Sequence, residues 1–91
     1  MNTILKTAVE IATKITFVDG KVIGQNYTIL PTMGTEFLDV WIKTIEGKEF
    51  HFGYNMSNRG PFDWSKDNKG VRVRLLFVGR DRDFMKIEIL S

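Results

Sequence analysis

Alternation of apolar and polar side chains with a period of two is the feature that most limits what this chain can form. Residues 71–79, VRVRLLFVG, place Val73, Leu75 and Phe77 on one side and Arg72 and Arg74 on the other. This period is typical of a β-strand with one buried face and one solvated face. We therefore expect this segment to be a strand whose arginines lie outside the core.

A second segment, FLDVWIKT, has the same period and predicts a second half-buried strand. Its inner set is Leu38, Val40 and Ile42, which leaves Phe37 and Trp41 on the opposite face. Either another layer covers these two aromatic residues or they form an exposed patch for a partner. We expect them to be covered.

Two acidic-Gly-Lys tripeptides, Asp19-Gly20-Lys21 and Glu46-Gly47-Lys48, lie between apolar runs. Such pairs favour tight hairpin turns, because a type I′ turn needs a positive φ angle at its central residues. Each tripeptide therefore predicts a hairpin with positive φ at its glycine. Pro31 and Gly34 predict a break between these hairpins, and GRDRD predicts a turn before the last strand, FMKIEIL.

These patterns predict a mainly β protein, a small antiparallel sheet or an SH3/OB-like barrel of about six strands. Residues 2–13 fit either a short helix or a strand, so the class becomes α+β if the helix forms. The order strand, Asp-Gly-Lys, strand in residues 15–24 resembles small Sm-like and SH3-like barrels. The resemblance covers only those residues and implies no particular function.

Length and composition predict a single domain over residues 1–91 that folds by packing alone. The chain contains no cysteine, and 43% of its residues are hydrophobic. Disulfides and thiolate metal sites are therefore excluded, and the apolar content is that of a globular chain. No segment is long and apolar enough to span a bilayer, so we expect a cytoplasmic protein with no membrane partner.

The sequence does not indicate an enzyme. His51 is the only histidine, and it alternates with Phe50 and Phe52 as an outward-facing strand residue would. No metal-binding or phosphate-binding motif occurs. The arginines beside Asp81 and Asp83 neutralise that carboxylate pair, so we expect no metal site and no cofactor.

The candidate site is the segment GYNMSNRGPFDWSKDNKG, residues 53–70, because structureless loops of this length are usually functional or disordered. Residues 57–91 carry eight basic and five acidic side chains, whereas residues 1–56 carry five and six. Phe62 and Trp64 either contact a partner or close the core beneath the loop. The candidate partner-binding residues are Tyr54, Arg59, Phe62, Trp64, Lys66, Lys69, Arg72 and Arg74.

Two functions fit this set of residues. The first is a non-catalytic module that binds a protein, as an adaptor or as an inhibitor that acts by occlusion, because Trp, Tyr and Arg dominate interface energetics. The alternative is a module that binds single-stranded DNA or RNA by stacking bases within a positive groove. No sequence feature decides between these partners, and the oligomeric state is also open.

Overall fold

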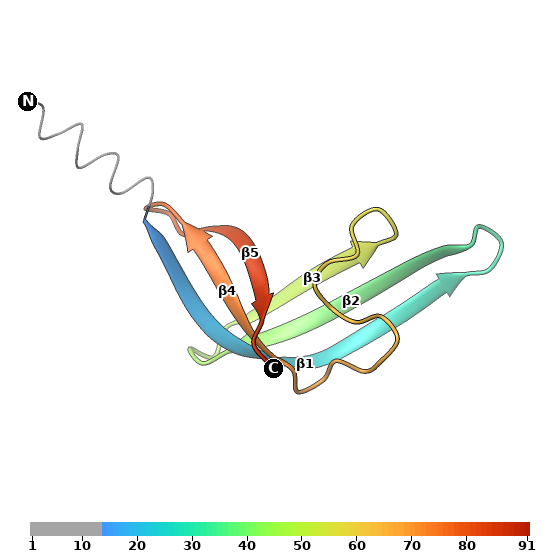
Figure 1. The fold of residues 1–91 in the computed structure, drawn as a ribbon, viewed down its shortest axis with the longest axis horizontal. Coiled ribbons are helices and arrows are strands. Elements are labelled where there is room, and N and C mark those ends of the chain that lie inside the picture. Colours follow the sequence, from blue (N-terminus) through green and yellow to red (C-terminus); the bar gives the residue numbers. More distant parts are fainter. Residues whose placement is uncertain (1–13) are drawn as a thin grey trace, which may run out of the picture.

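Five antiparallel strands form one curled sheet in the part of the chain that the structure, a computed structural model, describes, residues 14–91 (Figure 1). The strands are β1 (Ile15–Leu30), β2 (Thr35–Thr44), β3 (Glu49–Asn55), β4 (Arg72–Val78) and β5 (Asp83–Ile89). Their order in the sheet is β3-β2-β1-β4-β5. The mainly β, antiparallel fold expected from the alternation is therefore confirmed.

The long strand β1 joins two halves of the sheet. Residues 15–21 pair with β4, and residues 20–30 pair with β2, so both neighbours flank β1 only around Gly20 and Lys21. The register with β2 shifts between Val22 and Gly24, which marks a β-bulge at Ile23. Because a bulge bends its strand, it lets the two halves of the sheet curl toward each other as a half-barrel.

The core fills the inner, concave face of the half-barrel. Leu38, Val40 and Ile42 from β2 and Val73 and Leu75 from β4 are fully buried there. Rings from the two halves meet across the opening, with 5.0 Å between the ring centroids of Phe52 and Phe84 and 6.0 Å between those of Phe50 and Phe77. Aromatic packing, rather than backbone pairing, thus brings the edge strands together.

The face assignments made from alternation are confirmed for β2 and for β4. Leu75 faces inward, and Arg72 and Arg74 face outward with Lys21 and Asp19 as their partners on β1. In β5 the alternation is interrupted, because the register shifts opposite Leu76 and Phe77 and leaves Met85 without a partner position. Met85 is 41% exposed as a result and does not join the core.

The predicted hairpin turn at Asp19-Gly20 is wrong. Both residues lie in the middle of β1, and Gly20 is not among the residues with positive φ. Turn chemistry is local and is overridden here, because Gly20 pairs with Thr44 on one side and with Val73 on the other. The sheet therefore has five strands where about six were expected. The turn at Glu46-Gly47 is confirmed, with φ of 83° at Gly47.

The possible helix over residues 2–13 lies outside the described residues. Within residues 14–91, no helical segment has the length and hydrophobicity that crossing a bilayer requires.

Candidate interaction surfaces

The long connection between β3 and β4, residues 56–71, is a folded loop that packs on the inner face of the sheet. Its start is a turn in which Asn55 Oδ1 accepts hydrogen bonds from the backbone N–H groups of Ser57 and Asn58. Asp63 accepts hydrogen bonds from the backbone N–H and the hydroxyl of Ser65, and these bonds lower the pKa of the Asp63 carboxyl. Short polar turns thus hold the loop in one conformation.

Asn68 attaches this loop to the sheet. Its side chain is 2% exposed, and its Nδ2 donates to Gln25 Oε1 on β1 and to the backbone oxygens of Asp63 and Lys66. The backbone N–H of Asn68 also donates to Gln25 Oε1, and Gln25 Nε2 donates to Lys66 O. A buried amide with all these partners fixes the loop over the C-terminal half of β1, near Gln25.

Two of the predicted contact residues, Tyr54 and Phe62, are core residues in this fold. Tyr54 is 8% exposed and Phe62 is 6% exposed, and their ring centroids are 5.9 Å apart. Burial raises the pKa of the Tyr54 phenol. Gly60 lies directly against the Tyr54 ring, where a Cβ atom would be only 2.3 Å from Cε1. These two rings close the core beneath the loop and offer no free face for stacking.

Trp64 lies between core and solvent. Its indole N–H donates to the Arg59 carbonyl at 2.7 Å, and the Arg59 guanidinium lies 4.6 Å from the ring centroid. Tyr27 meets the same ring edge-on, with 6.2 Å between ring centroids. Arg59, Trp64 and Tyr27 therefore form a small partly exposed cluster that holds the loop against β1.

The predicted basic residues do not form one surface. Lys66 and Lys69 are exposed on the loop over the inner face, whereas Arg72 and Arg74 project from the outer face of β4. Arg74 donates to both carboxylate oxygens of Asp19, at 2.7 and 3.2 Å. This contact holds the pKa of Asp19 below its ordinary value. Arg74 is therefore a partner for Asp19 rather than a free cation.

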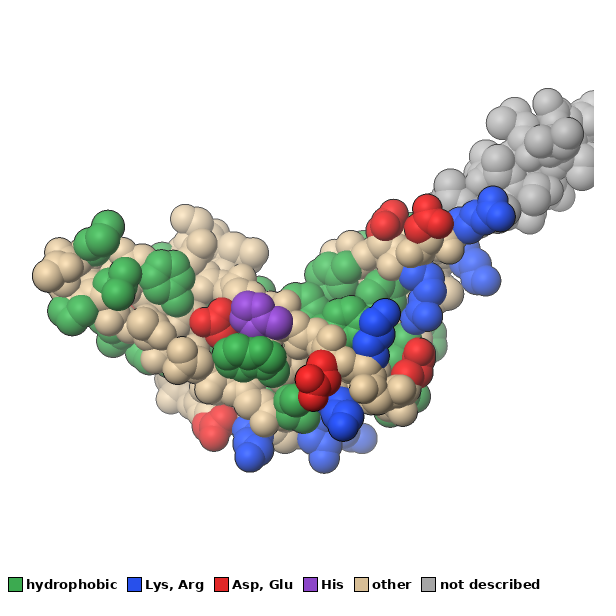
Figure 2. All heavy atoms as spheres, turned by 180° about the vertical axis from the view of Figure 1, so that it is seen from behind, with side chains coloured by type: hydrophobic (Ala, Val, Ile, Leu, Met, Phe, Trp, Pro, Cys, Tyr) green, Lys and Arg blue, Asp and Glu red, His purple; other side chains and the backbone are tan. Residues whose placement is uncertain are grey.

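The outer face of β2 and β3 is partly exposed, contrary to the expectation that it would be covered. Phe37 is 36% exposed and Trp41 is 38% exposed, and no element within residues 14–91 packs over them. His51 faces outward as predicted, with its ring 4.9 Å from that of Trp41 and its Nε2 2.9 Å from Asp39 Oδ1. The histidine is the purple side chain on this face in Figure 2.

The end of the β1–β2 hairpin exposes several large apolar side chains. Hydrophobic side chains gather at this end of the molecule, on the left in Figure 2. The exposed residues there are Tyr27 at 41%, Ile29 at 51%, Leu30 at 40%, Met33 at 76% and Phe37 at 36%. Sequence reasoning missed this surface, because the length of β1 was hidden by the apparent turn at Gly20.

One edge of β1 is also free at this end. The partners of β1 on β4 stop at Lys21, and Val22 makes the last backbone bonds on that side, with Gly70 and Val71. The loop then crosses Gln25 through side-chain contacts. Residues 26–30, NYTIL, have no backbone partner on that side among residues 14–91.

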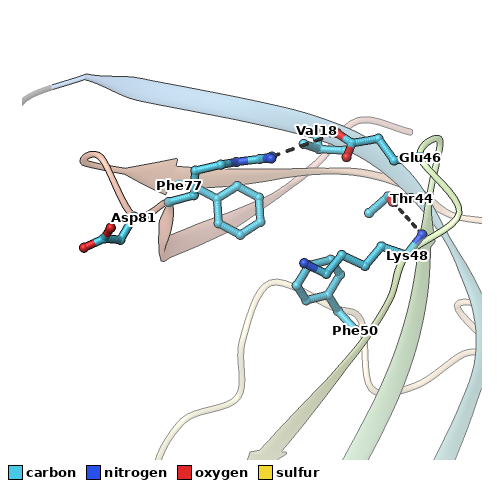
Figure 3. Close-up of a pocket in the computed structure, with 8 residues that line it drawn as sticks. Val18, Thr44, Glu46, Lys48, Phe50, Phe77 and Asp81 are labelled. Carbon is cyan, nitrogen blue, oxygen red and sulfur yellow. Dashed lines mark hydrogen bonds and ion pairs between the residues drawn. The ribbon is translucent and has the colours of Figure 1, made fainter. Parts of the chain in front are cut away.

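A hollow of about 240 Å³ lies at the opposite end, between the β2–β3 turn and the β4–β5 turn. Figure 3 shows Phe50 and Phe77 forming its apolar wall, with the Lys48 side chain extending along Phe50. Two acidic and two basic residues line this hollow: Glu46, Asp81, Lys48 and Arg82. Arg82 lies 3.9 Å from Glu46, and its guanidinium is 5.2 Å from the Phe77 ring centroid. The charges in this hollow balance one another.

A larger hollow of about 530 Å³ lies on the outer face where β1, β2 and β4 run side by side. Its lining includes three basic residues, Lys21, Lys43 and Arg72, and three apolar ones, Ile23, Ile45 and Leu90. Of these basic residues only Arg72 was predicted to bind a partner. Lys21 and Lys43 were missed, because their neighbourhood depends on the pairing of β1 with β2. Only the cross-strand register shows that Lys21 and Lys43 lie side by side in this hollow.

Within residues 14–91, no group of three or more His, Cys, Asp and Glu side chains could hold a metal ion. No family model, no curated protein and no solved structure matches this chain.

Proposed function

We propose that this protein is a non-catalytic binding module that acts as an adaptor, or as an inhibitor by occlusion, and that it binds an extended segment of another protein. The observation that carries the proposal is the free edge of β1 at residues 26–30. An unpaired strand edge presents a row of N–H and C=O groups, and addition of a partner strand satisfies them.

The composition of this edge supports strand addition. Proteins usually protect exposed edges with charged residues, prolines or covering loops. Residues 26–30, NYTIL, contain neither a charged residue nor a proline. The side chains alternate between faces, with Tyr27 and Ile29 toward the inner face and Thr28 and Leu30 toward the outer face. Main-chain bonds would supply affinity, and pockets for these side chains would supply specificity.

A charge placed on the edge tests this function. Ile29→Lys should abolish capture of the partner, because a lysine on an edge strand opposes strand addition. Ile29 is 51% exposed, so we expect little change in stability. Met85→Lys, at a 41% exposed position on β5, is the matched control and should retain the partner.

The measurement is affinity capture from the native host followed by mass spectrometry, with nuclease-treated and untreated lysate. A protein captured by the parent and by Met85→Lys, but not by Ile29→Lys, supports the proposal. Equal capture by all three variants contradicts it. Sedimentation of the purified protein checks whether the edge pairs with a second copy, since Ile29→Lys would then convert a dimer to a monomer.

Binding to single-stranded nucleic acid is the second candidate, favoured by the contact between Arg59 and Trp64 and by the exposed Lys66 and Lys69 nearby. Burial of Tyr54 and Phe62 leaves Trp64 as the stacking platform on the loop. Replacing Arg59, Lys66 and Lys69 together by Gln should weaken oligonucleotide binding and reduce its salt dependence. Binding that survives nuclease treatment and is insensitive to this triple change would exclude nucleic acid as the partner.

A further inference from the structure

The outer face carries three basic side chains in one row across the central strands. Lys21 on β1 pairs directly with Lys43 on β2 and with Arg72 on β4. Side chains directly opposite each other in an antiparallel sheet have Cβ atoms about 4.5–5.5 Å apart, and like charges in such positions are destabilising. The fold therefore places three positive charges together at a cost in stability.

Carboxylates within the described residues neutralise this row only in part. Asp19 lines the same hollow, but its carboxylate is engaged by Arg74. Glu49 pairs with Lys43 at the far end of the row without an ion pair within 4.0 Å. Arg72 Nε donates to Ser91 Oγ at 2.8 Å, which leaves its two terminal NH₂ groups as donors. The residues that line the hollow, three basic and one acidic, thus carry a net positive charge.

The apolar part of the lining consists of exposed aliphatic side chains. Ile45 is 82% exposed, the highest value among the exposed large hydrophobic residues, and Ile23 and Leu90 are 38% and 40% exposed. Ile23 is the bulge residue of β1, and a bulge changes the direction in which a side chain projects. The bulge therefore contributes to the position of Ile23 in the lining. Cations beside exposed aliphatic side chains suit a ligand with an anionic group and an apolar group.

We propose that this hollow is a binding site for a phosphate monoester that carries an apolar or aromatic group. Two ammonium groups and a guanidinium fit a phosphate dianion better than a single carboxylate, because lysine acts as a point charge for phosphate and arginine forks onto its oxygens. The attached group packs on Ile23, Ile45 and Leu90. This site is separate from the strand edge proposed for protein binding and does not depend on it.

The first test is titration with phenyl phosphate, followed by the amide signals of the ¹⁵N-labelled protein. The signals of Lys21, Ile23, Lys43 and Ile45 should shift together and saturate. Inorganic phosphate should bind about tenfold more weakly, and phenol should cause no saturable shift, because each supplies only half of the recognition. Shifts confined to Lys66 and Lys69 on the loop, or no saturation, would overturn the proposal.

Variants separate the charged half of the site from the apolar half. Lys21→Gln and Lys43→Gln should each weaken phenyl phosphate binding about tenfold, as expected for loss of one charge-assisted contact. Lys86→Gln is the matched control, because Lys86 lies on β5 beside Glu88 and should bind as the parent does. Equal affinity of Lys21→Gln and Lys86→Gln would overturn the assignment of the site.

Ile45→Ser tests the apolar half of the site. Because Ile45 is 82% exposed, this change should not destabilise the fold. It should weaken binding of phenyl phosphate and leave binding of inorganic phosphate unchanged. Equal losses for the two probes would show that the apolar wall takes no part. A parallel titration with a 5′-phosphorylated oligothymidine and with its unphosphorylated form distinguishes a nucleotide source of the phosphate from a small-molecule source.

Discussion

The segments Asp19-Gly20-Lys21 and Glu46-Gly47-Lys48 carry nearly the same tripeptide in two different structures. The second forms the tight turn between β2 and β3, with its glycine in the left-handed region at φ of 83°. The first is an extended part of β1 with a neighbouring strand on each side. A tripeptide that forms a turn in one place can therefore be extended in another, where pairing with two neighbouring strands favours the strand conformation.

The two glycines are used for different physical reasons. Gly47 has open space around it, since no atom lies within 4 Å of the place a Cβ would occupy, and its positive φ is what favours glycine. At Gly20, a Cβ would be 2.9 Å from the Lys43 carbonyl oxygen and 3.0 Å from Ile42 Cγ2. Close approach of the β2 backbone, rather than backbone conformation, therefore requires glycine at that position.

Replacing each glycine should give the largest effects and should separate the two reasons. Gly20→Ala should lower the unfolding free energy by about 2–3 kcal/mol, near the upper end for overpacking, because the clashing atom belongs to the backbone. Gly47→Ala should cost about 1–2 kcal/mol from the left-handed conformation alone. Urea denaturation at neutral pH measures both values.

Asparagine provides the control for these two substitutions. Gly47→Asn should recover part of the stability lost in Gly47→Ala, because asparagine tolerates the left-handed region. Gly20→Asn should be at least as destabilising as Gly20→Ala, because its side chain is larger. A recovery at position 20 would contradict the account of close backbone approach.

The acidic residues should give the second largest difference. Asp19→Asn removes the carboxylate that accepts two hydrogen bonds from Arg74, whereas Glu46→Gln affects only a 3.9 Å contact with Arg82. At neutral pH, Asp19→Asn should therefore lower the melting temperature more than Glu46→Gln. Equal losses of melting temperature would show that the Asp19–Arg74 contact stabilises the fold no more than the Glu46–Arg82 contact does.

Acid titration should show the contribution of the Asp19 carboxylate directly. The pKa of Asp19 is lowered in the folded state, chiefly by its hydrogen bond to Arg74, so its contribution is present above the ordinary value of 3.8. It is lost as the pH falls through the lower, folded-state pKa. The melting temperatures of the parent and of Asp19→Asn should converge in that range. Asp63 also has a lowered pKa, but both proteins retain it.

The sequence was sufficient to predict what depends on neighbours along the chain. Alternation identified the inner set of β2 and β4 correctly, including Leu38 and Leu75, because one face of each strand packs on a single core. The turn at Gly47 followed from local chemistry. The length of β1 did not, because the conformation at Gly20 is decided by contacts with residues more than twenty positions away.

The candidate site was predictable only in part for the same reason. Residues 53–70 were singled out as a loop that carries two aromatic side chains, but composition could not tell that Phe62 enters the core while Trp64 stays partly exposed. The basic row on the outer face joins Lys21, Lys43 and Arg72 from three strands. Cross-strand register created that row, and register is not visible in a sequence whose longest strand looks like a hairpin.

Replacing the lysines of the two tripeptides, Lys21 and Lys48, should give the smallest changes in unfolding free energy. The two changes should have opposite signs. Lys21 lies opposite Lys43 and Arg72, so Lys21→Gln should raise the unfolding free energy at low salt, by about 0.2–1 kcal/mol. Lys48 Nζ lies 5.6 Å from the Phe50 ring centroid, and Lys48→Gln should lower the unfolding free energy by about 0.5–1 kcal/mol.

Salt and ligand should both change the effect of Lys21→Gln on stability. The gain from Lys21→Gln should shrink toward zero at 1 M salt, where the screening length falls to about 3 Å. Saturating phenyl phosphate should reverse it, because the parent would then be stabilised by the ligand that the variant binds poorly. A Lys21→Gln variant that is less stable than the parent at low salt would show that the three cations of the outer row do not repel one another, and the comparison of the two tripeptides would then rest on their glycines alone.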